Sequence, residues 1–394
     1  MTFEASLSWE VRKQSGVHFT PLELARFVAN QTMLACRQHS HTGSLSILDP
    51  AVGDAALLDA ILEFAPASHE VRVVGFDTSQ DAVQHATARI AISPRPNITW
   101  EFHHGDFLEH VLAHYDGNAS GDLFPSPREQ FDIVISNPPY VRTQVLGAEK
   151  SQLIARRFGL SGRVDIYYAF LEAIARVLRV GGVAGIIVSN RFMTVRSGAV
   201  IREKLRKLFN ILHVWDLGDT KLFEAAVLPA VVLLERKGDQ VNRVITGFTS
   251  IYSNRGDGLP VLVASPIDAL DKDGLVQLAD GSRFLVRQGR LEHTEYLDDV
   301  WKVSEERSQT HLATVSAHTS SLFADLGKVR VGVKTTADKV FIRDDWDTLP
   351  DHLRPELLRP LLTHHCARRY RALRGSNSRK ILYPHEVLGG RRQP

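Results

Sequence analysis

The sequence predicts an α/β fold built on a doubly wound, mostly parallel sheet. Short β-branched apolar runs alternate with segments of helical spacing over residues 46–234, the pattern of a parallel sheet with helices on both faces. Three of these runs end at or near an acidic residue, and a fourth ends at Asn137-Pro138-Pro139-Tyr140. Ligands of open α/β sheets bind at the carboxyl ends of the strands, so we expect one binding site along this edge.

The individual elements follow in order along the chain. Seven apolar runs have the length and composition of strands: 46–48, 71–76, 98–103, 131–136, 183–188, 211–214 and 228–234. Apolar residues at helical spacing predict four helices: 55–62, 80–90, 166–178 and 200–208. Gly181 and Gly182 are expected to stop the third of these helices. The fourth is basic and amphipathic.

Composition limits the function. The chain has 394 residues, enough for two domains, and its 44% hydrophobic and 23% charged residues are ordinary for a soluble globular protein. Its two cysteines, Cys36 and Cys366, exclude a disulfide framework and a cysteine-rich zinc site, and no metal site is expected. The N-terminus lacks the apolar core of a signal peptide and no apolar run approaches a membrane span, so we expect a cytoplasmic protein without a membrane partner. The net charge of +2 does not by itself indicate a nucleic-acid partner.

The Asn-Pro-Pro-Tyr segment has the chemistry of a site for a planar amino group. Its prolines end the strand because neither donates to a sheet ladder, and Pro138 keeps Asn137 out of helical dihedrals. The side-chain oxygen of Asn137 and the carbonyl oxygen of Pro138 can then accept from one NH2 group beside the ring of Tyr140. Two acceptors raise the electron density on a delocalised nitrogen, which favours methyl transfer to an exocyclic or amide nitrogen. The alternative is a proline-capped strand end.

Residues upstream of this segment predict a cofactor site. Asp49 begins a tight turn between a strand and a helix, where the small residues Ala51 and Gly53 let the backbone approach a ligand. Asp77 ends the next strand about 20 residues further on, where a carboxylate can bind both hydroxyls of a ribose. The alternative for Asp77 alone is a helix N-cap.

Asp106 and Phe107 follow the third strand. The carboxylate of Asp106 could accept from an adenine amino group while Phe107 packs on the adenine ring. This gives three acidic strand ends in order before Asn-Pro-Pro-Tyr. The ordered series predicts a nucleoside cofactor more strongly than any of its members.

The order of these motifs resembles that of the adenine-specific (N6) DNA methyltransferases of type II restriction-modification systems. It matches their gamma-type arrangement, in which the cofactor loop comes first and the target region last, and the resemblance covers residues 12 to 237. It implies a seven-stranded class I methyltransferase sheet, which is Rossmann-like, with S-adenosyl-L-methionine as cofactor. It also implies methyl transfer to the N6 amino group of an adenine flipped out of double-stranded DNA.

The resemblance assigns roles to further residues. Thr20, in the motif 16–21, would contact the methionine part of the cofactor, and Asn137 would lie against cofactor and base. The Asn-Pro-Pro-Tyr segment would be the family's catalytic loop, and the motif 162–167 follows it. Phe223, in the motif 218–223, would sandwich the flipped base against Tyr140, although phenylalanine in such a place is more often a core residue. Ala55 departs from the family, which usually has a second glycine there, and its methyl group is expected to crowd the cofactor.

The region 238–394 is expected to recognise DNA, and residues 1–237 to hold the methyltransferase chemistry. The segment 326–335, with Lys334, resembles the opening of the family's target-recognition region. Arginines cluster in 364–380 and suit phosphates and guanine edges. The expected DNA-binding residues there are Arg368, Arg369 and Arg371. The alternative is a solvated basic helix, and the chain stops early enough for the recognition region to be incomplete.

Two other functions compete with DNA methylation. Asn-Pro-Pro-Tyr also serves methyltransferases of a glutamine amide or an RNA base amine, but those enzymes are usually shorter and lack a large basic region. A non-catalytic DNA-binding module is the third hypothesis, and the intact Asn137, Tyr140, Asp77 and Asp106 argue against it. No nuclease-like set of residues stands out in the C-terminal part, so we expect any restriction activity on a separate cognate restriction endonuclease.

Overall fold

The protein forms two compact units, residues 1–314 and residues 315–394. The computed structural model describes residues 20–37, 43–93, 95–115, 130–140, 153–154, 156–160, 165–222, 228–238, 244–254, 256, 258–291, 300–301, 303–304, 314–315, 317–321, 323–327, 335, 337–362, 367–368, 371–372, 379–383, 386–388 and 391–393. Within these residues no helix has the length and apolar character needed to cross a membrane.

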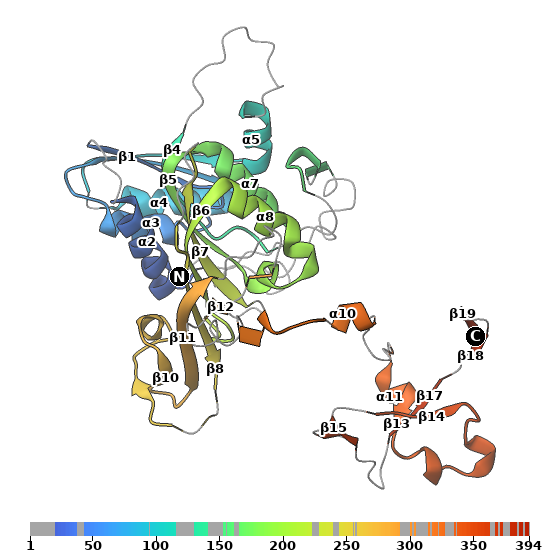
Figure 1. The fold of residues 1–394 in the computed structure, drawn as a ribbon. Helices are drawn as coiled ribbons and strands as arrows, with labels where there is room; N and C mark the ends of the chain where they lie inside the picture. Colours follow the sequence, from blue (N-terminus) through green and yellow to red (C-terminus); the bar gives the residue numbers. More distant parts are fainter. Residues whose placement is uncertain are drawn as a thin grey trace. The chain divides into compact units, whose positions relative to one another are not determined.

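The first unit is built on one large sheet with helices on both faces (Figure 1). Its first seven strands are β1 (Ser44–Asp49), β2 (Glu70–Asp77), β3 (Ile98–His104), β4 (Phe131–Ser136), β5 (Leu178–Ser189), β6 (Phe209–Asp216) and β7 (Pro229–Arg236). They lie in the order β3-β2-β1-β4-β5-β7-β6, and only β7 runs antiparallel to its neighbours. This arrangement confirms the predicted doubly wound, mostly parallel fold.

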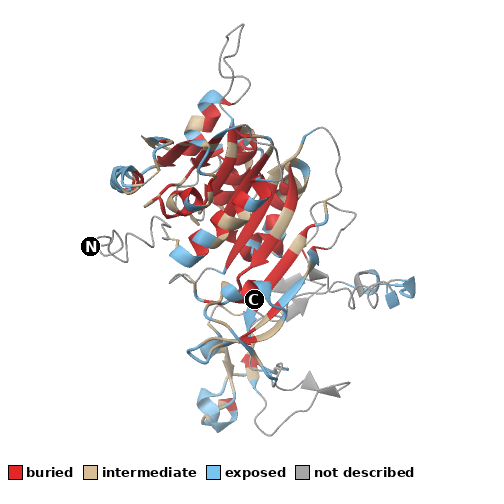
Figure 2. Cartoon of the chain, turned by 90° about the vertical axis from the view of Figure 1, so that its left-hand side faces the viewer, coloured by how far each residue is buried: buried red, intermediate tan, exposed pale blue. Residues whose placement is uncertain are grey.

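The helices divide between the two faces of the sheet. One face carries α2 (Leu22–Cys36), α3 (Ala56–Phe64) and α4 (Gln80–Ala91), and the other carries α5 (Phe107–His114), α7 (Ile166–Val177) and α8 (Ala199–Leu208). The strands between them are buried on both sides, as Figure 2 shows. In β4, for example, Ile133 and Ile135 pack with α2 and α3, whereas Val134 packs toward α7. This alternation follows from the two-residue period of a strand.

The helix predicted over 166–178 ends close to the predicted residue, but the prediction that Gly181 and Gly182 stop it is wrong. α7 ends at Val177, and Leu178 already has extended dihedrals and begins β5. Gly181 and Gly182 therefore lie within the strand and do not stop the helix. The pairing of β5 with β4 shifts between Phe131 and Ile133, and Gly181 there has a φ of 76°. The glycines accommodate an irregularity in the strand, because glycine adopts positive φ readily.

The sheet continues beyond β6. The added strands are β8 (Gly247–Ser253), β9 (Val261–Leu262), β10 (Gly274–Gln277), β11 (Arg283–Leu291) and β12 (Val303–Ser304). β8 pairs in parallel with β6, β11 pairs antiparallel with β8, and the described strands make a sheet of twelve. The short helix η4 (Asp268–Asp271) packs against one face of the added strands. The boundary predicted at residue 237, between methyltransferase chemistry and DNA recognition, thus falls inside one compact unit. The division of these two roles between the regions stays a prediction.

The second unit is made of short elements. One sheet contains β13 (Ile342–Arg343), β14 (Leu358–Pro360) and β17 (Lys380–Leu382), and two strand pairs accompany it: β15 (Ala367–Arg368) with β16 (Arg371–Ala372), and β18 (Glu386–Leu388) with β19 (Arg391–Gln393). Its helices are α10 (Phe323–Leu326), α11 (Asp338–Phe341), η5 (Trp346–Thr348) and η6 (Asp351–Leu353). In the arginine-rich segment, the described residues Ala367–Arg368 and Arg371–Ala372 form a strand pair, so these residues are not part of a basic helix.

Candidate active site

Asp49 joins the cofactor turn to the catalytic loop. Its side chain is buried, and one oxygen accepts from the backbone N–H of Ala51 at 3.0 Å and from the hydroxyl of Ser136 at 3.0 Å. Ser136 is the last residue of β4, directly before Asn137. Burial raises the pKa of Asp49 to about 7. Asp49 therefore holds two strand ends together and positions the turn that follows it.

The turn after β1 places two residues in left-handed dihedrals. Gly53 has a φ of 51° and Ala55 a φ of 61°. A Cβ at Gly53 would meet no heavy atom within 4 Å, so the backbone there faces open space. Ala55 is fully buried and belongs to the core beside α3. The expectation that its methyl group crowds the cofactor is therefore wrong, because that methyl group packs into the core. Glycine adopts such a positive φ more readily than alanine does, which agrees with the glycine that the family resemblance implies there.

Asp77 faces the same turn from the end of β2. One carboxylate oxygen accepts from the backbone N–H of Gly53 at 3.0 Å, and the other from that of Ser79 at 2.8 Å. Burial raises the pKa of Asp77. The N-cap of α4 is Ser79, whose hydroxyl oxygen accepts from the N–H of Ala82 at 3.3 Å. The alternative that Asp77 is merely a helix cap is therefore not supported.

The two residues after β3 have different surroundings. Asp106 is the N-cap of α5 and accepts from the N–H of Leu108 at 2.9 Å. The ring of Phe107 is only 2% exposed and lies 5.6 Å from Phe76 and 5.9 Å from Phe170, measured between ring centroids. These contacts favour a core role for Phe107 over the expected stacking on adenine. The sequence could not distinguish a core role from stacking on adenine, because each role needs an aromatic residue after the strand.

The catalytic loop brings three predicted residues together. The side-chain oxygen of Asn137 accepts from the hydroxyl of Tyr140 at 2.6 Å, and its amide nitrogen donates to the hydroxyl of Thr20 at 3.2 Å. Thr20 lies just before α2, 117 positions away in the sequence. The Tyr140 ring packs edge-on against Tyr167, with 6.3 Å between ring centroids. Burial raises the pKa of Tyr140, so its hydroxyl stays protonated at neutral pH.

Several predicted residues lie outside the part of the chain that the structure describes. They are Phe223, Lys334, Arg369 and residues 162–164 of the motif after the catalytic loop. Arg368 and Arg371 lie directly opposite each other in the β15–β16 pair. Of the segment 218–223, the first five residues are described, and Lys221 has a φ of 57°. The roles of these residues stay predictions.

Comparisons with known proteins identify the family of this chain. A family model described as Eco57I restriction-modification methylase matches residues 72–223. The type II methyltransferase M.PaeR7I of Pseudomonas aeruginosa is 31% identical over 60% of this chain and 40% of its own length. The type II methyltransferase M.BanIII of Aneurinibacillus aneurinilyticus is 33% identical over 97% of this chain and 67% of its own length. This chain belongs to the type II methyltransferases.

A solved structure extends the likeness to the fold of the methyltransferase. The type IIG restriction endonuclease BpuSI superposes on 89% of this chain and 41% of its own, with a TM-score of 0.51 and 20% identity. The match confirms the predicted class of fold. As a type II methyltransferase of a restriction-modification system, the protein uses S-adenosylmethionine as its cofactor, as the sequence predicted.

The residues at the strand ends of this methyltransferase fit that cofactor. The carboxylate of Asp77 suits ribose hydroxyls, and the backbone at Gly53 leaves room for a ligand beside it. The hydroxyl of Thr20 lies next to Asn137 and so links the cofactor residues to the catalytic loop. Among the described residues, no group of three or more histidine, cysteine or acidic side chains is arranged to hold a metal ion.

One polar network of the methyltransferase was not predicted. The side-chain amide of Asn190, just after β5, donates to Asp216 at 2.9 Å and to the hydroxyl oxygen of Tyr252 at 3.1 Å. The Tyr252 hydroxyl donates to the second oxygen of Asp216 at 2.7 Å, and Asp216 also accepts from the N–H of Gly218 at 3.2 Å. The network fixes the start of the segment 218–222. Asn190 and Asp216 follow the strand-end rule that identified Asp49 and Asp77, so the rule could have found them.

Proposed function

We propose that this methyltransferase transfers a methyl group from S-adenosylmethionine to the N6 amino group of an adenine in double-stranded DNA. The observation that carries this proposal is the meeting of Asn137, Tyr140 and Thr20 at the end of β4, beside the turn that Asp49 ties to the same strand. Acceptors for an amino group and residues for the cofactor thus share one edge of the sheet.

Asn137 and Pro138 would hold the amino group. The side-chain oxygen of Asn137 has two lone pairs, and the Tyr140 hydroxyl uses one of them. The other can accept from one amino hydrogen while the carbonyl oxygen of Pro138 accepts from the second. These contacts strengthen as the nitrogen becomes pyramidal, so they lower the barrier more than they stabilise the bound substrate.

No strong base is required for this reaction. The bound cofactor supplies the methyl group, and the methylated nitrogen, once positively charged, is acidic enough to release a proton to water. Tyr140 keeps its own proton at neutral pH and therefore acts by orienting Asn137 rather than by accepting a proton. Rate enhancement then comes from position and electrostatics.

The target adenine must leave the DNA stack to reach this loop. The ring of Tyr140 is half-buried and held against Tyr167, so it presents an ordered aromatic surface. Stacking on such a ring recovers about 1–3 kcal/mol per base. We assign Phe223 to the other side of the base, since the Asn190–Asp216–Tyr252 network fixes the segment that leads to it.

The test is to identify the methylated base. DNA from cells that express the chain is digested to nucleosides and analysed by mass spectrometry, with cells that express Asn137→Ala as the matched control. We expect N6-methyladenine with the parent chain and none with the variant. N4-methylcytosine in place of N6-methyladenine would contradict the choice of base, and methylation of a protein glutamine without modified DNA would contradict the class of substrate.

A further inference from the structure

One face of the added strands is covered, and the other is exposed at Tyr252, Arg283 and Arg287 and buried at Phe248 and Ser250. On β8 and β11, the side chains of Ile251, Phe284 and Val286 are buried and belong to the core that includes η4. The opposite face carries six side chains that we call the arginine face: Phe248, Ser250, Tyr252, Arg283, Leu285 and Arg287. They share this face because successive side chains of a strand alternate, and because Tyr252 lies opposite Leu285 and Ser250 opposite Arg287.

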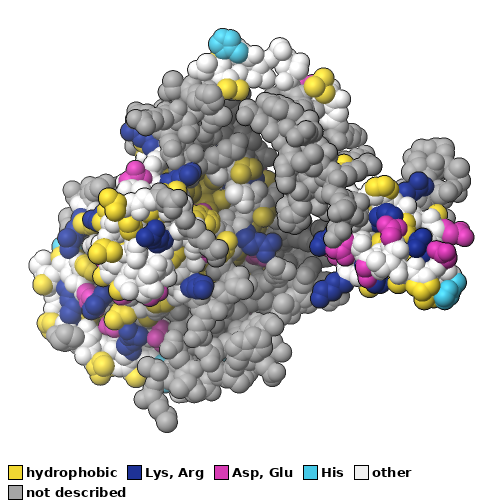
Figure 3. All heavy atoms as spheres, turned by 90° about the horizontal axis from the view of Figure 1, so that it is seen from below, with side chains coloured by type: hydrophobic (Ala, Val, Ile, Leu, Met, Phe, Trp, Pro, Cys, Tyr) yellow, Lys and Arg dark blue, Asp and Glu magenta, His cyan; other side chains and the backbone are white. Residues whose placement is uncertain are grey.

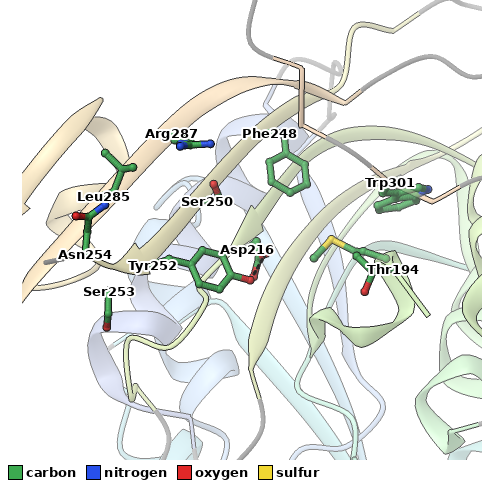
Figure 4. Close-up of a pocket in the computed structure, with 11 residues that line it drawn as sticks. Thr194, Asp216, Phe248, Ser250, Tyr252, Ser253, Asn254, Leu285, Arg287 and Trp301 are labelled. Atoms are coloured by element: carbon green, nitrogen blue, oxygen red, sulfur yellow. Dashed lines mark hydrogen bonds between the residues drawn. The ribbon is translucent and has the colours of Figure 1, made fainter. Parts of the chain in front are cut away.

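The arginine face opens onto two adjoining cavities. The first, of about 370 Å³, is lined by Tyr252 and Arg287 together with Asp216, and Figure 4 shows these side chains around one space. The second, of about 960 Å³, is lined by Arg283 and by Lys221 of the segment 218–222. Ser253 and Asn254 line both cavities, so the two adjoin at the end of β8, and we call the two cavities together the hollow. The hollow reaches the segment that precedes Phe223.

The two arginines give the arginine face the charge that suits an anionic partner. Arg283, Arg287 and Lys221 are exposed, and none of the six residues of the arginine face is acidic. Three carboxylates line the two cavities, and each accepts from a backbone N–H: Asp216 from Gly218 at 3.2 Å, Asp219 from Ser253 at 2.7 Å and Asp280 from Ser282 at 2.8 Å. Figure 3, a view from the end of the first unit that carries β10 and β11, shows lysine and arginine side chains interspersed with hydrophobic and acidic ones.

The spacing of the two arginines suits a nucleic-acid backbone. Arg287 lies four positions after Arg283 along the strand, a span of about 13 Å between their Cα atoms. Nucleotides rise by about 3.4 Å each along the axis of duplex DNA, so a β11 strand aligned with that axis would place the two arginines about four nucleotide steps apart. Tyr252, on the neighbouring strand, is 38% exposed, and its hydroxyl is held by Asp216. The ring is thereby held between the two arginines and the segment 218–222.

We propose that the arginine face binds the sugar–phosphate backbone of duplex DNA beside the target nucleotide, with Arg283 and Arg287 on phosphates. This inference rests on the proposed function, because it takes the target strand to enter next to the segment 218–222. It adds a DNA contact in the first unit, before the arginine cluster of the second. DNA would then be held close to the reacting base by strands of the same sheet that carries the catalytic loop.

The test compares two faces of one strand. In the full chain, Arg283→Ala with Arg287→Ala removes both guanidinium groups from the phosphates. Arg290→Ala is the matched control, because Arg290 is exposed on β11 but points to the opposite face. Binding of short labelled duplexes of random sequence is measured by fluorescence anisotropy over a salt series. We expect the double variant to bind about tenfold more weakly or worse, and the slope of log K against log salt to fall by about 1.8 for two phosphates that are no longer neutralised.

The remaining measurements separate the outcomes. Cofactor affinity, measured by calorimetry, should equal that of the parent in both variants, which shows that the sheet is intact. Arg290→Ala should keep the parental slope, and Arg287→Lys should restore most of the slope that Arg287→Ala removes. A double variant with the parental slope, or a control that weakens as much as the double variant, would overturn the arginine face. A parent chain that binds no duplex at all would instead count against the proposed function.

Discussion

At the scale of single residues, the candidate site depends on side chains that hold one another. Asn137 contacts Tyr140 and Thr20, and Asp49 contacts the residue before Asn137. The contacts with Thr20 and Asp49 join the end of β4 to distant parts of the chain, and the contact with Tyr140 lies within the loop after β4. Substitutions here should therefore separate chemistry from binding.

Replacing Asn137 by alanine should slow methyl transfer by about 100-fold or more, because one acceptor for the developing positive charge is removed. Tyr140→Phe is the matched variant, since it keeps the aromatic ring and removes only the hydroxyl that orients Asn137. Its effect on the rate should be smaller. Single-turnover transfer to DNA measures both. Parental rates in Asn137→Ala would show that the amide does not act on the amino group.

Replacing Asp77 by alanine should weaken binding of S-adenosylmethionine by about 1.5–3 kcal/mol, the contribution of hydrogen bonds to a charged group. The carboxylate also holds the N–H of Gly53, so the turn would be held less firmly without it. Calorimetry with the cofactor measures the change, and DNA affinity without cofactor serves as the control. Unchanged cofactor affinity would leave Asp77 with a purely structural role.

Asp49 should make stability depend on pH. Burial raises its pKa from 3.8 to about 7 in the folded protein, so the folded state favours the protonated form. The stability that this group contributes is complete below pH 3.8 and is lost as the pH rises toward about 7. Asp49→Asn cannot ionise and should become progressively more stable relative to the parent over this range. Urea unfolding at several pH values measures the difference, and a gap that stays constant would contradict the assignment.

At the scale of elements, α2 lies unusually close to β5. A Cβ on Gly185 would come within 1.9 Å of the hydroxyl oxygen of Thr32 and 3.1 Å of a methyl carbon of Val28. Both residues are buried on α2. Glycine therefore allows the close approach of the helix whose first turn follows Thr20.

Gly185→Ala should destabilise the protein by about 1–3 kcal/mol, the usual cost of overpacking a core. It should also slow transfer, because a displaced α2 moves Thr20 away from Asn137. Gly105→Ala is the control, since a Cβ there meets no heavy atom within 4 Å. Thermal unfolding and single-turnover transfer measure the two effects. Equal stability of the two variants would mean that α2 shifts at no cost.

Strand ends were predictable because each needs only local information. The apolar runs before Asp77 and Asn137 are set by burial on both faces, and the polar residue follows where the strand leaves the core. Asn190 and Asp216 follow the same strand-end rule, but their contacts with Tyr252 join residues up to 62 positions apart, so no local pattern reveals the network itself. The parallel pairing of β8 with β6 could not be predicted from a local pattern either, because it depends on contacts that only the folded sheet brings together.

At the scale of the whole molecule, the two units should contribute separately to DNA binding. Neutralising Arg368, Arg369 and Arg371 together should weaken binding and reduce its salt dependence, by about 0.9 in the slope for each phosphate that the variant no longer binds. Cofactor affinity should not change, because every proposed cofactor residue lies in the first unit. Anisotropy titrations over a salt series measure the slope. A triple variant with the parental slope would remove this segment from the DNA interface.

The parallel pairing of β6 with β8 limits where this protein can be cut and rejoined. If the chain ended after Arg236, the far side of β6 would become an uncovered sheet edge, with a row of unpaired backbone donors and acceptors. Such an edge invites strands of other molecules, so a fragment ending there should aggregate rather than fold as a soluble catalytic core. A chimaera that acquires a foreign recognition module would have to be joined beyond Ser304, after the last strand that the catalytic sheet recruits.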